Sequence, residues 1–529
     1  MFYKSYKKYA MHKKRKRLSL SPMLITIILM AVQIIFFIIL YTKLKMYKDF
    51  FRVGLLAVTV VLVVKIITGT EKSAYKVAWI LPITATPIFG VMLYALIKYF
   101  PGTRTLTQRM RTRIEKSKKY FNQDNHLIDE FDKVNEHYGD LAKLLYSCDN
   151  FPTYSGTDCE YYSLGEFAFE EIKKRLEKAE KYIFIEFFII KQGKLLDEIL
   201  EILSEKVKQG VEVRFLFDGS NFVSLPWEYD EYIRSLGIKC KVFLKPTPVL
   251  SSYQNNRDHR KIVVIDGKVA FTGGINLADE YANLIERFGH WKDCAIKIEG
   301  EAVRTFTGIF LQMWNIGEKD EGKSDFEQYL TKETQKEIAA VNSGYAKQNF
   351  VIPYADYPGN NDNPAESVYL HMLFFAKRYI YIMTPYLVID DDFMLALKFA
   401  SKRGVIVRLI IPGIPDKKIP YLVAKSYLPE IIDSGAEVYL YTPGFVHSKA
   451  FVSDDVVSTV GTVNLDFRSM YLHFENGVLA YDEDLAKCIK KDFEETFAKC
   501  EKISRSFYDE MPLFEKLAAK MFRIFAPIM

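Results

Sequence analysis

Long uncharged stretches occupy much of the first hundred residues. Residues 18–42 carry no charged side chain and are mainly Leu, Ile, Phe and Val, and residues 77–97 form a second uncharged stretch that includes Pro82 and Pro87. Either stretch is long enough to cross the roughly 30 Å hydrocarbon core of a bilayer as a helix. We therefore predict transmembrane helices over residues 18–42 and 77–97.

A third apolar stretch, residues 53–69, is interrupted by Lys65 and is a marginal candidate for a span. Basic residues flank the apolar region on both sides, before residue 18 and after residue 97. Lys and Arg accumulate on the cytoplasmic side of a span, so an even number of crossings satisfies both flanks. We expect two full spans, with one apolar stretch re-entrant or interfacial.

From about residue 150 the pattern changes to short apolar runs that alternate with amphipathic stretches. Residues 182–190 predict a buried strand, and a helix and the strand 210–219 follow. The same order recurs with strands at 379–386 and 404–413 around another helix. The fold class is therefore α/β, with two repeated half-domains that usually pack as parallel sheets under helices and form one site at their junction.

This pattern gives a plan for the whole chain. We expect a basic cytoplasmic tail at 1–17, a membrane region at 18–100, a linker at 101–150, a first half-domain at 151–345 and a second at 346–529.

Charge is concentrated in the tail. The chain of 529 residues is 49% hydrophobic and 26% charged, which is typical of a folded protein. Eight of its 72 basic residues lie in the first twenty, where there is no acid, and 64 basic and 66 acidic residues remain. The tail should attract anionic lipid headgroups, whereas the remainder is too weakly basic to predict a nucleic-acid partner. The six scattered cysteines predict reduced structural thiols.

One constellation of four residues occurs in each half. In both copies a Lys follows a His by two positions, an Asp follows it by seven and an Asn by seventeen. Such a match in two repeat-related places is improbable by chance. The constellation comprises His259, Lys261, Asp266 and Asn276 in the first half and His447, Lys449, Asp454 and Asn464 in the second.

These residue types suit phosphate chemistry. Alternate residues on a strand face the same side, so each His and its Lys should point together into one cleft. The lysines supply positive charge, and the turn residues Gly274 and Thr462, with the two asparagines, supply neutral donors. One imidazole can attack phosphorus while the other protonates the leaving alkoxide. An Asp that closes a strand is often only a turn residue.

The constellations resemble the HKD motifs of the phospholipase D superfamily, and the chain from about residue 75 onward is similar to bacterial cardiolipin synthases. The similar segments are residues 79–94, 273–281, 291–293, 384–386 and 464–469, together with Glu475.

The resemblance implies a reaction in which two phosphatidylglycerol molecules give cardiolipin and glycerol, with no metal and no cofactor. It implies that His259 forms a phosphatidyl-histidine intermediate and that His447 acts first as the acid and then as the base. It implies that the motif acids and Glu475 orient the histidines. The phosphoryl oxygens would be bound by Lys261, Lys449, Asn276 and Asn464. An integral protein of the bacterial cytoplasmic membrane, with its catalytic part on the cytoplasmic side, is expected.

Other functions stay open at this point. Water could open the same intermediate, which would make the chain a phospholipase D-type hydrolase, and serine could open it in a phosphatidylserine synthase. A nuclease is less favoured because it needs no membrane anchor. A membrane scaffold that retains the fold without activity is the non-enzyme alternative, although neither His nor Lys is lost. Residues 507–529 either lie on the bilayer or pack on the second half.

Overall fold

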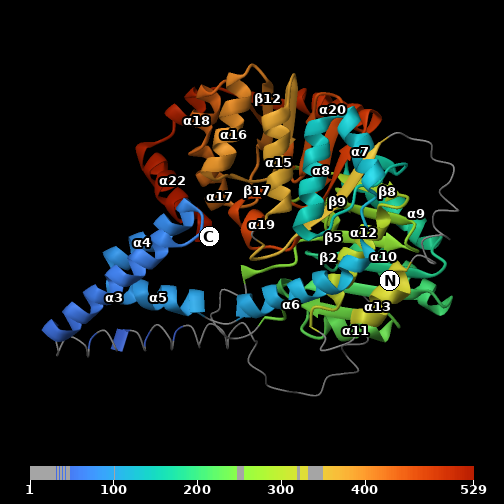
Figure 1. The fold of residues 1–529 in the computed structure, drawn as a ribbon, viewed down its shortest axis with the longest axis horizontal. Coiled ribbons are helices and arrows are strands. Elements are labelled where there is room, and N and C mark those ends of the chain that lie inside the picture. Colours follow the sequence, from blue (N-terminus) through green and yellow to red (C-terminus); the bar gives the residue numbers. More distant parts are fainter. Residues whose placement is uncertain are drawn as a thin grey trace.

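The computed structural model describes residues 31, 35, 38, 39, 42, 48–99, 102–246, 255–317, 322–331, 349–360 and 362–528. The basic tail and most of the predicted span 18–42 lie outside the described residues. The two halves lie side by side, the first drawn mainly in green and the second in orange and red (Figure 1). At the N-terminal end, the helices α3 (Lys48–Thr68), α4 (Ser73–Ala85) and α5 (Pro87–Tyr99) project from this body (Figure 1).

The first half is built on a seven-stranded sheet in the order β1-β8-β6-β5-β2-β3-β4. β2, β3 and β4 run parallel, and the remaining neighbours are antiparallel. Helix α10 (Lys194–Lys208) buries Leu196, Leu200 and Leu203, a spacing that gives a helix one apolar face. The strands are β1 (Asp158–Tyr162), β2 (Tyr182–Phe187), β3 (Glu212–Asp218), β4 (Lys239–Phe243), β5 (Lys261–Ile265), β6 (Val269–Gly273) and β8 (Ala295–Glu299).

The second half repeats this order in β9-β18-β16-β15-β10-β12-β13 and adds β19 at the edge. The predicted internal repeat is therefore confirmed. Its strands are β9 (Phe350–Asp356), β10 (Tyr379–Met383), β12 (Ile406–Pro412), β13 (Glu437–Tyr441), β15 (Ala450–Ser453), β16 (Val457–Gly461), β18 (Glu475–Tyr481) and β19 (Cys500–Ile503).

Both sheets are mixed, which corrects the expectation of parallel sheets. Each motif strand returns through a tight turn, and tight turns join antiparallel strands. Asp266 and Gly267 have φ of 53° and 68° between β5 and β6, and Asp454 and Asp455 have φ of 58° and 64° between β15 and β16. The φ values have the sign that hairpin turns with right-handed twist require.

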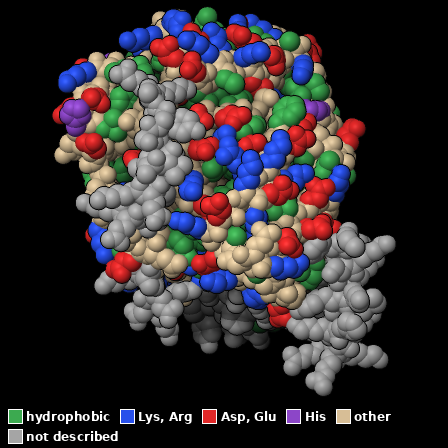
Figure 2. Space-filling view, turned by 90° about the vertical axis from the view of Figure 1, so that its right-hand side faces the viewer, with side chains coloured by type: hydrophobic (Ala, Val, Ile, Leu, Met, Phe, Trp, Pro, Cys, Tyr) green, Lys and Arg blue, Asp and Glu red, His purple; other side chains and the backbone are tan. Residues whose placement is uncertain are grey.

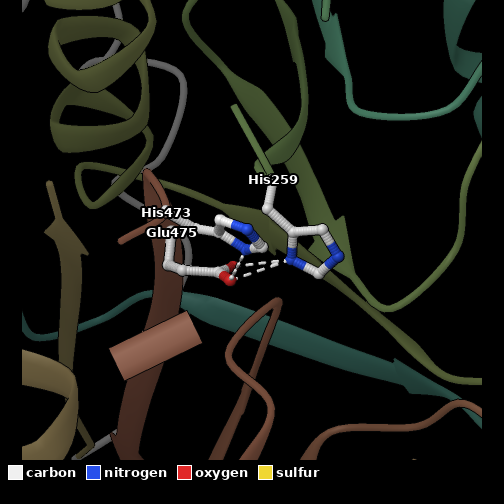
Figure 3. A group of neighbouring side chains, drawn as sticks. All are labelled: His259, His473 and Glu475. Carbon is white, nitrogen blue, oxygen red and sulfur yellow. Dashed lines mark hydrogen bonds and ion pairs between the residues drawn. The ribbon is translucent and has the colours of Figure 1, made fainter. Parts of the chain in front are cut away.

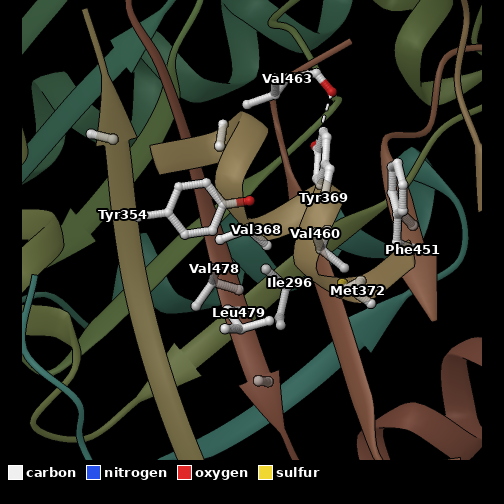
Figure 4. Packing of buried hydrophobic residues seen from close by; sticks show 14 of the residues in the cluster. Ile296, Tyr354, Val368, Tyr369, Met372, Phe451, Val460, Val463, Val478 and Leu479 are labelled. Atoms are coloured by element: carbon white, nitrogen blue, oxygen red, sulfur yellow. Dashed lines mark hydrogen bonds between the residues drawn. The ribbon is translucent and has the colours of Figure 1, made fainter. Parts of the chain in front are cut away.

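One hydrophobic core runs through both halves. Ile296 of β8 packs among Val478 and Leu479 of β18, and Tyr369 stacks on Phe451 with ring centroids 4.1 Å apart (Figure 4). Each fully buried side chain of this size contributes about 1.5–3 kcal/mol. The halves therefore form a single folding unit that can hold a shared site rigidly.

The predicted helix over residues 77–97 is instead two helices, α4 (Ser73–Ala85) and α5 (Pro87–Tyr99). Pro87 disfavours helical geometry at Thr86, whose φ and ψ are −136° and 74°. The chain reverses there, and a Cβ on Gly90 would lie 2.4 Å from the Pro82 carbonyl oxygen, so the helices touch closely. Residues 53–69 fall largely in α3 (Lys48–Thr68). Among the described residues, no helix combines the length and the apolar character needed to cross a membrane.

The segment expected as a linker folds into three helices, α6 (Gly102–Ser117), α7 (Asn125–Val134) and α8 (Glu136–Asp149). Near the end of α6, Ser117 accepts a 2.9 Å hydrogen bond from Gln312 of the first half. In α7, Phe131 stacks on Phe350 of the second half with centroids 4.0 Å apart. These helices therefore join the two halves.

At the C-terminal end, α22 (Leu513–Phe525) lies beside α17 (Lys418–Lys425) and α4 (Figure 1). Ala519 is fully buried, whereas Leu513, Phe514 and Leu517 are exposed. The helix therefore packs on the second half and also presents an apolar face. On the side of the molecule away from these helices, cationic and anionic side chains are interspersed (Figure 2). All six cysteines are free.

Candidate active site

Each motif histidine stands at a crossing between the halves. His259 lies two residues before the start of β5, and its backbone N–H donates to the Phe474 carbonyl oxygen at 2.9 Å. His447 follows β14 (Gly444–Val446), and its N–H donates to the Lys292 carbonyl oxygen at 2.7 Å. The expectation that the histidines lie within strands is therefore corrected, because the backbone of each is paired with the opposite half.

The side chains of the two histidines are also paired with residues of the opposite half. Nδ1 of His259 lies 2.9 Å from the carboxylate of Glu475 in the second half, and Nδ1 of His447 lies 2.8 Å from Asp293 in the first half. Nε2 of His259 points away from Glu475 (Figure 3). Each carboxylate therefore favours the tautomer with the proton on Nδ1 and leaves Nε2 as the reactive nitrogen.

The two motif lysines are fully buried beside the histidines. Nζ of Lys261 donates to the His259 carbonyl oxygen at 2.5 Å, and Nζ of Lys449 donates to the carbonyl oxygen of His447 and lies 2.9 Å from its Nδ1. Burial lowers the pKa of Lys261 to about 7 and the pKa of Lys449 to about 8. The negative charges of Glu475 and Asp293 raise both pKa values, but by less than burial lowers them. Such lysines gain charge and stability when an anion binds.

Both imidazoles are neutral at neutral pH. Burial, followed by the charge of Lys261, lowers the pKa of His259 well below its usual value, and burial and Lys449 lower the pKa of His447 to about 4. The charge of Lys449 in the second half also lowers the pKa of His259, so the two half-sites lie close enough to interact electrostatically. A phosphate bound there would raise these pKa values, because an anion favours the protonated forms.

The two motif asparagines are buried. Asn276 accepts a 2.9 Å hydrogen bond from the N–H of Ile189, and its buried Nδ2 has no hydrogen-bond partner among the described residues. Asn464 donates to the hydroxyl of Ser469 at 3.0 Å, and its buried Oδ1 likewise has no hydrogen-bond partner among the described residues. The unused donor of Asn276 suits a phosphoryl oxygen.

Gly274 and Thr462 lie against the orienting carboxylates, and their expected binding of phosphate stays a prediction. A Cβ on Gly274 would lie 2.0 Å from Oδ1 of Asp293, so glycine allows that carboxylate to reach His447. The hydroxyl of Thr462 donates to Glu475, the partner of His259. Both residues thus act on the histidines through an acid.

The motif acids do not orient the histidines, which corrects that expectation. Asp266 accepts hydrogen bonds of 2.7–2.8 Å from the backbone N–H groups of residues 180–182, and Asp454 accepts bonds of 2.7–3.1 Å from those of residues 377–379. The five residue-to-residue steps from Lys261 to Asp266 span roughly 16 Å of extended strand. Each Asp therefore fixes the far end of its motif strand to the start of a neighbouring strand.

Three further residues were not predicted. Asp293 takes the place that the motif acids were expected to fill. Arg260 is fully buried and donates 3.1 Å hydrogen bonds to the carbonyl oxygens of Glu475 and Asp356. His473 lies beside His259 with ring centroids 5.4 Å apart (Figure 3). Asp293 falls in the Trp-Lys-Asp segment that carries the family resemblance, whereas no sequence signal marked His473.

Comparison with known proteins agrees with this geometry. A family model described as "Cardiolipin synthase, PLD-like domain" matches residues 172–314 and 369–497, and one described as "Phospholipase_D-nuclease N-terminal" matches residues 57–98. A cardiolipin synthase from Geobacillus kaustophilus is 34% identical over 87% of this chain and 90% of that protein. One from Clostridium perfringens is 32% identical over 85% and 94%.

Two further relatives extend the comparison. An uncharacterized protein from Streptococcus mutans is 44% identical over 86% of this chain and 96% of that protein. The crystal structure of a phosphatidylserine synthase from Haemophilus influenzae covers 73% of this chain and 97% of its own, with a TM-score of 0.54 and 17% identity, which shows a shared fold. The paired His-Lys half-sites, the repeated sheets and the extended similarity lead to one conclusion: the chain belongs to the cardiolipin synthase family of phospholipase D-like proteins.

Proposed function

We propose that this chain is a cardiolipin synthase that transfers a phosphatidyl group from one phosphatidylglycerol to the terminal hydroxyl of another. The observation that carries the proposal is the reciprocal pairing of two buried histidines with carboxylates of the opposite half, beside two buried lysines. This arrangement offers one nucleophile, one acid and two cations to a single phosphodiester.

In the first step, Nε2 of His259 attacks phosphorus and the bond to the glycerol oxygen breaks. Lys261, Lys449 and the free donor of Asn276 stabilise the negative charge on the phosphoryl oxygens. The bound phosphate raises the pKa of His447, which then delivers its proton to the departing glycerol oxygen. A phosphatidyl-histidine and free glycerol result.

In the second step, the terminal hydroxyl of another phosphatidylglycerol gives its proton to Nε2 of His447. Its oxygen bonds to phosphorus, the bond to Nε2 of His259 breaks, and the electron pair returns to the imidazole. One phosphodiester is exchanged for another. The reaction therefore needs no energy from a nucleotide.

The surface suggests how the enzyme meets its lipid. Exposed apolar side chains follow α3 and α22, and α22 also carries Lys516, Lys520 and Arg523. Apolar and basic groups together suit an anionic membrane surface. We infer that the protein is held in the bacterial cytoplasmic membrane through residues 18–100 and α22. The exposed large apolar residues are Val53, Leu56, Val58, Val60, Val61, Val64 and Ile67 on α3 and Leu513, Phe514, Leu517, Met521 and Phe522 on α22.

The catalytic halves then lie on the cytoplasmic side. A cysteine at exposed Gln108 should be shielded from membrane-impermeant thiol reagents in intact cells, with Cys488 replaced beforehand because it is exposed. Labelling of that cysteine in intact cells would reverse the proposed orientation.

The test of the activity uses full-length protein reconstituted in phosphatidylglycerol vesicles, with cardiolipin and glycerol measured together. Equal amounts of both products are expected, and His259→Ala should make neither. His126→Ala, which alters a histidine that is 78% exposed on α7, is the matched control and should retain full activity. Phosphatidic acid without cardiolipin would mean a hydrolase.

A further inference from the structure

His473 is a third histidine in the active site. It lies in the segment between α19 (Phe467–Tyr471) and β18, and its side chain is 9% exposed. Its Nδ1 is 3.6 Å from Glu475, beyond hydrogen-bond distance, and neither ring nitrogen has a hydrogen-bond partner among the described residues. A buried imidazole with an unmet donor and an unmet acceptor is costly unless a ligand satisfies it.

Four cationic side chains act electrostatically on this imidazole. Burial lowers the pKa of His473, and the charges of Arg468, Lys261, Lys417 and Arg257 lower it further. The backbone brings two of them close, because the His473 N–H donates to the Arg468 carbonyl oxygen at 2.9 Å and the Phe474 N–H donates to that of Arg257 at 2.8 Å. Only Lys261 belongs to the motifs, so the other three are additional cations that act on this imidazole, although Arg257 also lies 3.5 Å from the buried carboxylate of Asp218.

These cations bear on which ligand fits. Ligand atoms of His259, His473 and Glu475 lie within 4.8 Å of one another, a spacing that could hold a metal ion. The surrounding cations oppose a metal ion and favour an anion. A neutral imidazole offers one donor and one acceptor, which suits hydroxyl groups. The surroundings therefore favour a ligand that carries both hydroxyls and a phosphate.

We propose that His473, Arg257, Lys417 and Arg468 form the subsite of the acceptor phosphatidylglycerol. His473 holds the glycerol hydroxyls of the acceptor, and the three cations hold its phosphate. This inference rests on the proposed function, because an acceptor lipid is needed only if the phosphatidyl-histidine is opened by an alcohol.

The subsite lies where the second step needs it. The ring of His473 is next to the ring of His259, whose Nε2 carries the phosphatidyl group in the intermediate. With the donor phosphate on Lys261 and Lys449, the acceptor phosphate needs other cations. An acceptor held at both its hydroxyls and its phosphate competes with water for the intermediate, since positioning raises its effective concentration. His473 is thus a positioning residue that directs the reaction to transfer.

The test compares soluble acceptors that meet the same phosphatidyl-enzyme. Reconstituted full-length protein receives phosphatidylglycerol and equal concentrations of glycerophosphoglycerol, glycerol or ethanol, and each phosphatidyl product is measured. Ratios of products cancel any change in the first step. Arg468→Gln combined with Lys417→Gln should lower the preference for glycerophosphoglycerol over glycerol by about tenfold, because charge-assisted contacts to the phosphate are lost.

His473→Leu should lower the preference for glycerol over ethanol by about tenfold, the loss expected when a hydrogen bond to the hydroxyls is removed. His473→Gln, which can still donate and accept, should restore most of it. Lys491→Gln, at a cation that is 76% exposed on α20 (Glu483–Phe497), is the charge control and should leave both ratios as in the wild type.

The outcomes separate the two proposals. If the wild type makes cardiolipin and both ratios stay unchanged in the variants, the acceptor subsite is refuted and the synthase activity stands. If the wild type transfers to no alcohol and yields only phosphatidic acid, both are refuted. Because Arg468 and Lys417 are exposed, their variants remain informative even if His473→Leu folds poorly.

Discussion

The carboxylate of Glu475 in the second half lies 2.9 Å from Nδ1 of His259 in the first. This contact fixes the tautomer and the orientation of the proposed nucleophile, and Thr462 in turn holds the carboxylate. The nucleophile therefore depends on a residue that the other half supplies.

Replacing that acid tests the dependence. Glu475→Gln should lower kcat by about a hundredfold or more, because an amide can donate to Nδ1 and so favour the wrong tautomer. Steady-state turnover of phosphatidylglycerol measures it, and Asp293→Asn should act similarly through His447. Glu286→Gln, an exposed acid in the first half, is the control. Activity near wild type in Glu475→Gln would show that the contact does not orient His259.

The lowered pKa values of the lysines set a pH dependence. The pKa values of Lys261 and Lys449 are about 7 and about 8, so both are charged below that range and lose charge as the pH rises through it. Their cationic forms bind the phosphodiester, so kcat/KM should fall as the pH rises above about 7, where Lys261 is the first to lose its charge. A profile of kcat/KM from pH 6 to 9.5 measures this.

Lys261→Arg keeps a charge in that whole range, since guanidinium does not titrate there, and leaves Lys449, with a pKa of about 8, to set the alkaline limb. Whatever its absolute activity, its alkaline limb should move to higher pH. A limb at the wild-type position would mean that another group causes it.

The motif acids should matter for stability more than for chemistry. Asp454→Asn weakens three hydrogen bonds to the backbone N–H groups of residues 377–379, and bonds to a charged group are worth about 1.5–3 kcal/mol each. We expect a loss of about 2 kcal/mol or more in urea unfolding. The folded fraction should keep the pH profile of the wild type. Asp509→Asn, exposed on α21 (Ser506–Asp509), is the control, and an altered profile without lost stability would contradict this role.

The sequence predicted the repeat and the motif residues because both depend on local periodicity and spacing. It placed His259 and His447 correctly in two repeated halves, and the apolar runs at 182–190 and 379–386 correspond to β2 and β10. It did not predict that each histidine pairs with a carboxylate of the opposite half, because the contact between His447 and Asp293 joins residues 154 positions apart. Contacts of that kind depend on how the halves pack, which periodicity does not encode.

The same limit explains the errors. The spacing from His to Asp gave no sign that Asp266 would lie at the far end of β5 from its histidine, where it binds backbone amides. The uncharged stretch 77–97 predicted one helix because hydropathy depends only on which residues are present. Pro87 divides the stretch into two helices because it disfavours helical backbone angles at the residue before it. His473 carries no motif, and only its neighbours in space reveal it.

Lys72 couples the N-terminal helices to the second half. At the start of α4, its ammonium lies 2.7 Å from Glu366 and 2.8 Å from Asp390, both buried, and 2.5 Å from Asp392. Although burial alone would lower the pKa of Lys72, these carboxylates hold it above its usual value. Lys72→Met leaves the acids without their cation and should release α3–α5 from the body.

Limited proteolysis measures that release, with faster cleavage near residues 99–102 expected in Lys72→Met. Lys76→Met, one turn later on α4, is the matched control because, within the described part of the chain, the Lys76 ammonium donates to the Ile67 carbonyl oxygen of α3 and not to the second half. Equal cleavage of both variants would show that Lys72 does not fasten the helices.

The apolar face of α22 should determine how tightly the enzyme binds to membranes. Leu517 and Met521 are one turn apart on that face and 54% and 55% exposed, so charge there costs little in the folded protein. In contact with a bilayer the same charges oppose insertion and repel anionic headgroups. The measurement is a flotation assay with phosphatidylglycerol vesicles, on a protein that lacks residues 1–47 and is kept in mild detergent until the vesicles are added. In this background, Leu517→Glu with Met521→Glu should weaken vesicle binding about tenfold. Leu395→Glu, at a site 60% exposed on α16 (Asp391–Lys402), is the control for added charge and should bind like the parent protein. If all three proteins bind alike, α22 does not rest on the membrane, and its exposed apolar side chains must meet another partner.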